Sequence, residues 1–194
     1  MNKNKTNNLK NVLAKHIKDN IKEYIIVALM FIIGIFLGVL FINNTKEAQT
    51  AEITTYFNNF ITKFKETQNI NSMQMLKESI GQDILLACAI WFFGTTIIGI
   101  PIVFGIVLFR GFCLGYTIST CIAIMGFSKG ILFVLIALLI QNVIFIPALI
   151  AIAVSGFKLY KSIMKDKRKE NIKLEIVRHT VFSIIMLIFF IISS

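Results

Sequence analysis

The stretch ILLACAIWFFGTTIIGIPIVFGIVLFRGFCLGYTISTCIAIMGFS, residues 84–128, contains a single charged residue, Arg110. As one helix it would be about 67 Å long, because an α-helix rises about 1.5 Å per residue, whereas the hydrocarbon core of a bilayer is about 30 Å thick. The stretch must therefore turn. Arg110-Gly111 is the polar, flexible break near the right place, so we predict a turn there at the membrane surface. An arginine at the bilayer centre would cost about 2.5–3.5 kcal/mol; an intramembrane functional charge is the alternative interpretation.

The composition of the chain is that of an integral membrane protein. Of its 194 residues, 56% are hydrophobic and 15% are charged, and a soluble domain of this size could not bury so many apolar side chains. The net charge of +10 favours contact with the anionic inner leaflet rather than with nucleic acid, because the basic residues stand beside apolar runs. Cys88, Cys113 and Cys121 also lie in apolar runs, so we interpret them as small hydrophobic side chains and not as disulfide or metal-binding cysteines.

Apolar runs predict five transmembrane helices within a single polytopic domain, residues 1–194. The first run, Tyr24 to Ile42, has 19 uncharged residues. It is too long for the apolar region of a typical signal peptide, so we expect a retained anchor. Ser128-Lys129-Gly130 is the predicted turn before the fourth span. The predicted spans cover about residues 24–42, 84–109, 111–127, 131–157 and 176–192.

The distribution of lysine and arginine sets the predicted orientation. With five crossings, fifteen basic residues fall on the N-terminal side of the membrane and five on the other side. The positive-inside rule then places residues 1–23 and the basic loop 158–175 inside, and the loop 43–83 and the C-terminus outside. We therefore predict an all-α integral membrane protein with an amphipathic N-terminal helix and a helical outer loop.

An amphipathic helix is predicted within residues 1–23. Its apolar side chains share one stripe at helical spacing, and Lys10, Lys15, Lys18 and Lys22 lie off that stripe. Such a helix lies on the inner leaflet with its lysines toward anionic lipid. An ordinary positively charged segment beside the first span is the alternative.

The outer loop carries aromatic side chains at helical spacing. Phe57, Phe60 and Phe64 fall on one face with Tyr56 on its flank, and a second short helix is expected over residues 72–80. Apolar surface left in water costs about 25 cal/mol per Å². The aromatic face therefore packs on the membrane or on the other loop helix, or it binds a partner protein.

Pairs of glycines stand four residues apart at Gly34/Gly38, Gly111/Gly115 and Gly126/Gly130. This spacing lets the backbones of two helices approach closely. The spacing is also common by chance in glycine-containing spans, and a helix–helix contact at the first pair is the alternative interpretation. The third pair straddles the turn predicted near residue 128, and we assign it to that turn.

The fourth predicted span contains Gln141 and Asn142, the strongest polar group at mid-membrane. Amides surrounded by lipid must find hydrogen-bond partners, so we expect them to face other helices and to lock the bundle; a substrate pathway is the alternative. Pro147 removes a helical hydrogen bond in the same span. We expect Pro101 to kink the second span in a similar way.

The sequence contains no recognisable catalytic constellation. The uncharged apolar runs have no group for ion coupling or for intramembrane proteolysis. His16 and His179 lack a cysteine or carboxylate at ligand spacing, and Ser155 and Ser183 lack a nucleophile-elbow pattern. We therefore expect no enzyme activity, no cofactor and no metal.

Three segments carry a resemblance to a known family: HIKDNIKEYI at 16–25, RGFCLGYTIS at 110–119 and QNVIFIPALI at 141–150. With them, the chain resembles the stage II sporulation protein M family of endospore-forming bacteria. The family opens its third span with a basic residue and a glycine, followed by a glycine–aromatic pair, and has a QN…IP sequence in its fourth span. The matching residues here are Arg110, Gly111, Gly115, Tyr116, Gln141, Asn142, Ile146 and Pro147.

The resemblance implies a membrane scaffold in the mother-cell membrane. Family members anchor and localise two peptidoglycan hydrolases, stage II sporulation proteins D and P, at the sporulation septum during engulfment. The residues themselves leave two other functions open. One is a transporter or channel subunit with Gln141 and Asn142 at the midplane, and the other is a protein that binds the anionic membrane surface through its basic inner side. A homo-oligomer is compatible with each of these functions.

Overall fold

The computed structural model describes residues 17–45, 51–56, 58–59, 62, 72–96, 98–136, 140–165 and 169–193. The predicted all-α class is confirmed for these residues, because every regular element among them is a helix. Three helices in this part of the chain are long and apolar enough to cross a membrane, namely α2, α5 and most of α7. The helix bounds are α2 (Ile21–Asn43), α4 (Ser72–Gly94), α5 (Gly99–Met125), α6 (Phe127–Val134), α7 (Ile140–Lys165) and α8 (Lys169–Ser193).

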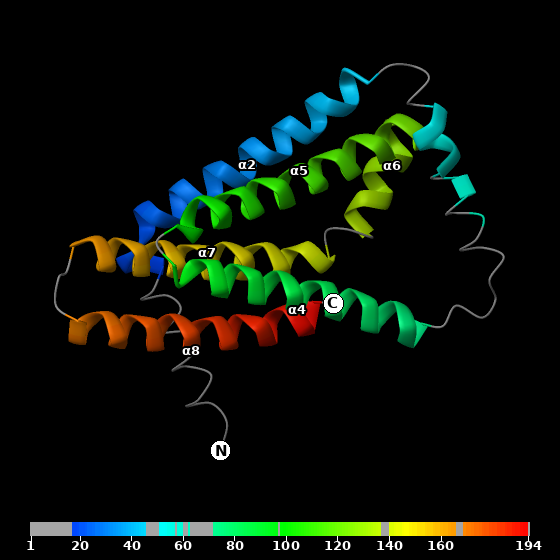
Figure 1. The fold of residues 1–194 in the computed structure, drawn as a ribbon. Helices are drawn as coiled ribbons and strands as arrows, with labels where there is room; N and C mark the ends of the chain where they lie inside the picture. Colours follow the sequence, from blue (N-terminus) through cyan, green and yellow to red (C-terminus); the bar gives the residue numbers. More distant parts are fainter. Residues whose placement is uncertain are drawn as a thin grey trace.

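The axes of the long helices are roughly aligned, and successive long helices along the chain point in opposite directions (Figure 1). α2 lies against α5, and α4, α7 and α8 pack on one another as a second group. The start of α2, the α4–α5 turn and the α7–α8 connection lie at one end of the bundle, at the left of Figure 1. The short helix α6 lies at the opposite end, across the space between the two groups.

α7 is the central helix of the bundle. About 56% of its most apolar window is buried, compared with 22% in α2 and in α5. Phe145, Leu149 and Ile152 of α7 are fully buried, and they belong to the same apolar core as Val103 and Val107 of α5. The apolar residues on the outer faces of α2 and α5 are exposed, as expected for helices that contact lipid.

The chain reverses between Gly94 and Gly99, so the turn predicted at Arg110-Gly111 is wrong. Thr95 and Thr96 donate side-chain hydrogen bonds of 2.7 and 3.0 Å to the carbonyl oxygens of Phe92 and Phe93. These bonds satisfy carbonyls that have no partner at the end of α4. The predicted spans 84–109 and 111–127 are therefore replaced by α4, which ends at Gly94, and by α5, which runs through residue 110 without a break.

Pro101 is the third residue of α5 and does not interrupt a helix, which corrects the predicted kink. The first residues of a helix have N–H groups without a helical acceptor, so a proline there removes no hydrogen bond. Gly99 stands so close to the carbonyl of Phe93 that a Cβ atom would overlap it. Glycine and proline therefore begin α5 immediately after the turn.

α4 begins at Ser72, where a short loop helix was predicted to start, but it continues to Gly94 instead of ending near residue 80. The second half of the predicted outer loop is thus the first half of the helix that carries the apolar run from residue 84. Residues 72–83, assigned by the sequence to a loop, are therefore helical, and among those whose side chains the structure describes Asp83 is the buried one.

Gly126 makes the turn between α5 and α6 with φ +77°, a conformation that favours glycine. The turn predicted at Ser128–Gly130 is wrong, because these residues belong to α6. Gly130 packs on the backbone of α5, where a Cβ atom would lie 2.8 Å from the carbonyl oxygen of Cys121. The predicted fourth span, 131–157, is also divided, since α6 ends at Val134 and α7 begins at Ile140.

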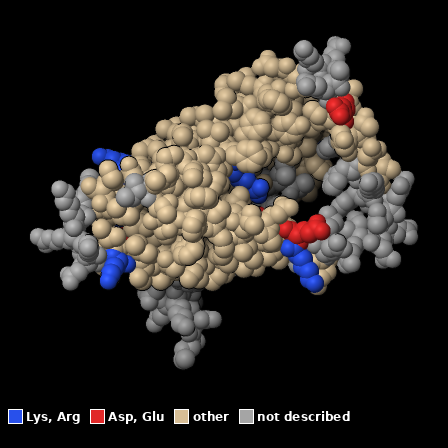
Figure 2. Space-filling view, viewed as in Figure 1, with Lys and Arg blue, Asp and Glu red and all other residues tan. Residues whose placement is uncertain are grey.

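Charged side chains on the visible face gather toward the two ends of the molecule (Figure 2). The middle of that face is uncharged except for a small group of basic and acidic atoms in a recess. Charged side chains therefore also lie between the helices, away from the two ends.

Candidate functional site

Arg110 lies inside α5 at the level of Asp83 in α4. It follows Gly99, the first residue of α5, by eleven residues, and Asp83 precedes Gly94, the last residue of α4, by eleven residues. At a rise of about 1.5 Å per residue, both residues are about 16 Å from the turn. The hairpin therefore brings an acidic and a basic side chain to the same depth in the bundle.

The two side chains form an ion pair that a third helix covers. Arg110 Nη2 is 3.9 Å from Asp83 Oδ1, and the guanidinium carbon is 4.4 Å from the centre of the Phe145 ring on α7. Asp83 is 5% exposed and Phe145 is fully buried, whereas the Arg110 side chain is 35% exposed. The carboxylate and the aromatic face both offset the cost of placing a guanidinium between helices.

The second carboxylate oxygen, Asp83 Oδ2, is buried and has no hydrogen-bond partner within the described part of the chain. Removing Arg110 would therefore take away the charge partner of a buried carboxylate whose Oδ2 atom already has no donor among the described residues. Arg110 is thus an interhelical contact of α4, α5 and α7, and not a residue of a surface turn.

One feature of the sequence is consistent with this pair. Asp83 and Arg110 flank an uncharged run of 26 residues, and Thr95-Thr96 lies near its middle. A run with opposite charges at its ends and hydroxyl side chains at its midpoint is consistent with a helical hairpin that pairs those charges.

Next to this pair, glycines of α2 make the closest contacts between α2 and α5. A Cβ atom on Gly34 would overlap the carbonyl oxygen of Leu108, and one on Gly38 would overlap that of Phe112. Both glycines are buried. Of the two interpretations of the Gly34/Gly38 spacing, the helix–helix contact is therefore the one that the structure shows, and chance spacing is wrong.

The glycines that follow Arg110 make the reciprocal contact. A Cβ atom on Gly111 would overlap the carbonyl oxygen of Phe31, and one on Gly115 would overlap that of Ile35. α2 and α5 therefore interlock through small residues from both sides, as in close helix pairs within membranes. This contact holds α5, and with it the Arg110 side chain, at a fixed rotation.

A second buried polar contact joins α7 and α8 beside the end of α4. His179 Nδ1 and Ser155 Oγ share a hydrogen bond of 2.9 Å, and the two residues are 2% and 7% exposed. Trp91 of α4 donates a bond of 3.2 Å to Thr180 Oγ1. No local pattern in the sequence predicts this group, because Ser155 and His179 are 24 residues apart and meet only once α7 and α8 are antiparallel.

Small residues again permit this approach. A Cβ atom on Gly94 would lie 3.0 Å from His179 Nε2, and one on Gly156 would lie 3.1 Å from the Cα atom of Gly94. Ser155 and His179 do not by themselves form a catalytic site, because a nucleophile needs access to substrate and donors for an oxyanion. We interpret them as a contact that fixes the relative position of α4, α7 and α8.

An ion pair also connects α2 to α7 at the end of the bundle where α2 begins and α7 finishes. This end carries Lys18, Lys22, Lys158 and Lys161 and is called the basic end. Lys161 Nζ donates a hydrogen bond of 2.7 Å to Glu23 Oε1 and lies 4.9 Å from the centre of the Phe157 ring. Lys18 and Lys22 of the predicted basic helix are exposed, whereas Lys10 and Lys15 lie outside the described residues. The prediction of an amphipathic helix over residues 1–23 therefore remains a prediction.

The other predicted site residues are placed as follows. Tyr116 stacks on Phe112, with ring centroids 6.3 Å apart, and both rings face Phe41 of α2. Asn142 is half-buried, and Pro147 is exposed inside α7. Tyr56 is 72% exposed. Phe57, Phe60 and Phe64 and the side chain of Gln141 lie outside the described residues.

Within the residues that the structure describes, no three His, Cys, Asp or Glu side chains are grouped so that they could hold a metal ion. Several of the described polar contacts connect separate helices, among them Arg110 with Asp83, His179 with Ser155, and Lys161 with Glu23. Chemically, this arrangement can hold helices in fixed positions and present the outer faces of the bundle to lipid or to partner proteins.

The family model of stage II sporulation protein M matches residues 27–194 of the chain. The match includes every helix with described bounds except the first turns of α2. No curated protein and no solved structure matches the chain.

Proposed function

Because the chain belongs to the stage II sporulation protein M family, we propose that it is a membrane scaffold that anchors and localises peptidoglycan hydrolases at the sporulation septum during engulfment. The observation that carries the proposal is the family match over residues 27–194. The proposed partners are stage II sporulation proteins D and P, and the proposed location is the mother-cell membrane. The chain itself supplies no catalytic step in this proposal.

The proposed scaffold crosses the membrane five times, through α2, α4, α5, α7 and α8. The alternating direction of these helices supports five crossings (Figure 1). Lys18, Lys22, Lys158 and Lys161 belong to the end where α2 begins and α7 finishes, and the positive-inside rule supports placing that end in the cytoplasm. The loop after α2 and the α5–α6 turn then face the hydrolases outside.

The packing of the bundle supports a scaffold because its buried polar contacts join separate helices. The Asp83–Arg110 pair joins α4 to α5, and the Ser155–His179 bond joins α7 to α8. A protein that positions partners benefits from such fixed contacts, since each one limits the relative movement of the helices. In this proposal, the buried charges maintain the shape of the surface that the partners bind.

Affinity purification of the full-length chain from sporulating cells tests the function. We expect stage II sporulation proteins D and P to co-purify with the chain, and fluorescent fusions of both to lose their septal position when it is absent. A chain lacking residues 46–71 should retain its membrane insertion and lose the hydrolases, whereas Gly105→Ala should retain both. Normal septal localisation of both hydrolases without the chain would contradict the proposed function.

A further inference from the structure

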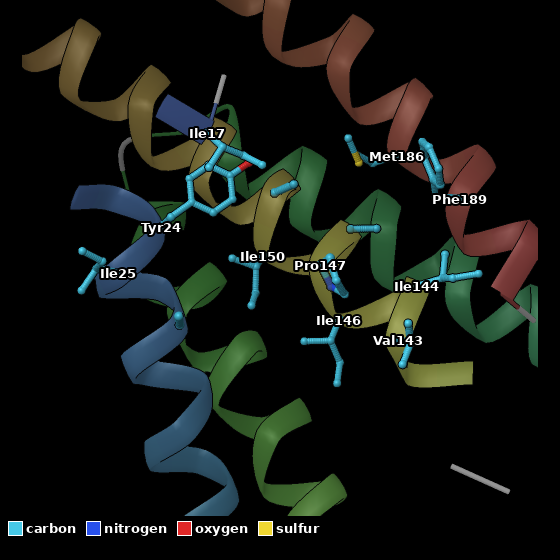
Figure 3. Close-up of a pocket in the computed structure, with 13 residues that line it drawn as sticks. Ile17, Tyr24, Ile25, Val143, Ile144, Ile146, Pro147, Ile150, Met186 and Phe189 are labelled. Carbon is cyan, nitrogen blue, oxygen red and sulfur yellow. The ribbon is translucent and has the colours of Figure 1, made fainter. Parts of the chain in front are cut away.

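Two pockets border α7 and α8, and their linings differ in charge. The larger one, about 650 Å³, is lined by Tyr24 of α2, Pro147 of α7 and Phe189 of α8, among others (Figure 3). Among the described residues, its lining includes no charged side chain, so it lacks a group that would orient a polar ligand. The smaller pocket, about 320 Å³, lies between α7 and α8 alone and combines charged with apolar side chains.

The charges in the smaller pocket lie where the uncharged parts of α7 and α8 end. Lys158 directly follows residues 140–157 of α7, and Arg178 directly precedes residues 179–193 of α8, and neither stretch contains Asp, Glu, Lys or Arg. Lys158 is seven residues before the end of α7, and Arg178 is nine residues after the start of α8. Both therefore belong to the basic end. In helices that cross a membrane, such positions lie at the level of the lipid headgroups.

The apolar lining continues from these charges toward the middle of the bundle. Val181, Phe182 and Ile185 follow Arg178 along α8 by three to seven residues, roughly 5–10 Å at the helical rise. Val181 and Arg178 are exposed, so the pocket opens on the outer face of the bundle. Positive charge at the headgroup level with apolar surface beneath it is complementary to a molecule with an anionic head and an apolar tail.

Lys158 supplies a positive charge that the described protein does not neutralise. Arg178 Nη1 donates a hydrogen bond of 2.8 Å to Glu175 Oε1, so these two charges offset each other. Lys158 is half-buried, and none of the ion pairs within the residues that the structure describes includes it. An ammonium group that is partly removed from water is stabilised by an anion. The pocket thus favours a ligand that brings a negative charge to Lys158.

We infer that this pocket binds one anionic phospholipid from the leaflet at the basic end. The phosphate lies at Lys158, beside the remaining N–H groups of Arg178, and an acyl chain runs along Val181 and Ile185. The buried bond between Ser155 and His179, which also line the pocket, joins the two helices that hold the lipid. This inference goes beyond the proposed anchoring of hydrolases and does not depend on it.

Native mass spectrometry of the purified full-length chain tests the lipid site. The chain is incubated with equal amounts of phosphatidylglycerol and phosphatidylcholine of identical acyl chains and is then released from detergent. We expect one phosphatidylglycerol to be retained with a preference of about fivefold, the contribution of one lysine near an anionic lipid. Glycerophosphoglycerol, which is the headgroup without acyl chains, should not displace the lipid at the same concentration.

Variants of one lysine test the position of the phosphate. Lys158→Gln should retain the two lipids equally, and Lys158→Arg should keep the preference for phosphatidylglycerol because it keeps the charge. Lys173→Gln is the matched control, since Lys173 is an exposed residue of α8 at the same end of the bundle and does not line the pocket. It removes the same charge and should behave as the wild type.

A second pair of variants tests the position of the acyl chain. Val181→Trp places an indole in the apolar part of the pocket and should lose the retained phosphatidylglycerol. Ile184→Trp is the control, because Ile184 is an exposed residue of the same helix outside the pocket. It should retain the lipid as the wild type does.

Equal retention of the two lipids by the wild-type chain would overturn the inference. An equal loss of preference in Lys158→Gln and Lys173→Gln would show attraction by the whole basic surface and would overturn the site as well. Displacement by glycerophosphoglycerol would assign the pocket to a soluble phosphate ester instead of a lipid. If Val181→Trp fails to fold, the two glutamine variants still decide. Capture of hydrolases is measured separately, so failure of the lipid site leaves the proposed function standing.

Discussion

Asp83 and Arg110 stand eleven residues before and after the ends of the α4–α5 turn and meet with Oδ1 and Nη2 3.9 Å apart. The symmetry follows from hairpin geometry, because equal numbers of helical residues cover equal lengths. The Arg110 guanidinium, which would be costly alone in the bilayer, thus lies opposite the Asp83 carboxylate. Formation of the α4–α5 hairpin therefore brings the two charges together.

Arg110→Ala is expected to destabilise the protein by about 3 kcal/mol. The substitution leaves the buried Asp83 carboxylate unpaired, and breaking buried pairs costs about 3–5 kcal/mol. We expect the lower value because Arg110 is 35% exposed and the pair is 3.9 Å long. Unfolding of the purified protein in mixed micelles, followed by circular dichroism, measures the change.

Replacing both charges provides the control for this prediction. Arg110→Leu combined with Asp83→Leu removes the unpaired carboxylate, and we expect it to recover much of the stability lost by Arg110→Leu alone. Additive losses in the double variant would show that the two charges do not stabilise each other. Arg178→Ala breaks the exposed pair with Glu175 and should change stability by about 1 kcal/mol or less.

The contact between α2 and α5 predicts opposite effects for glycines of the same helix. Gly111→Ala would place a methyl group against the carbonyl of Phe31 and should separate the helices, with a loss of about 1–3 kcal/mol, as for other overpacked contacts. Gly105→Ala meets open space and should be neutral or stabilising by up to about 1 kcal/mol. Urea or dodecyl sulfate titration compares the two, and equal effects would refute the interlocked contact.

Parts of this fold could be predicted because they rest on local patterns. The run from Tyr24 to Ile42 lies within α2, and Gly34 and Gly38 make the helix contact that their four-residue spacing allows. The start of α4 at Ser72 was also predicted, since a hydroxyl residue often begins a helix. Each of these features depends on residues within one or two helical turns of one another.

The charged pair could not be predicted in this way. An arginine without a visible partner is costly in a membrane, so Arg110 was assigned to the surface, although Asp83 supplies the partner from another helix. The real turn carries no charge, because Thr95 and Thr96 satisfy the end of α4 with their own hydroxyl groups. His179 and Ser155 likewise required knowledge of how α7 and α8 align.

The buried bond between Ser155 and His179 predicts that Ser155→Ala destabilises the bundle. The imidazole nitrogen would lose its partner inside the protein, which costs about 1–3 kcal/mol. Thr117→Ala is the matched control, because Thr117 is exposed and its hydroxyl bonds the carbonyl of Cys113 in its own helix. We expect a change in stability within about 0.5 kcal/mol. Thermal unfolding of both variants in one detergent tests the difference. If Ser155→Ala is as stable as the wild type, the bond does not stabilise the bundle.

The position of the α4–α5 turn predicts which residues water-soluble reagents reach. In a background lacking Cys88, Cys113 and Cys121, Ile98→Cys should react with a membrane-impermeant maleimide, because Ile98 is 84% exposed beside the turn. Phe109→Cys, next to Arg110, should stay unlabelled although Phe109 is 64% exposed, since its surroundings would be lipid.

Labelling inverted and right-side-out vesicles separately gives the orientation as well. Reaction of Ile98→Cys in inverted vesicles alone is the outcome expected for a cytoplasmic turn, and Thr45→Cys, after the far end of α2, should react from the opposite side. Strong labelling of Phe109→Cys together with protection of Ile98→Cys would return the turn to Arg110. It would also remove the Asp83–Arg110 pair from the bundle, because the two residues could no longer lie at the same depth.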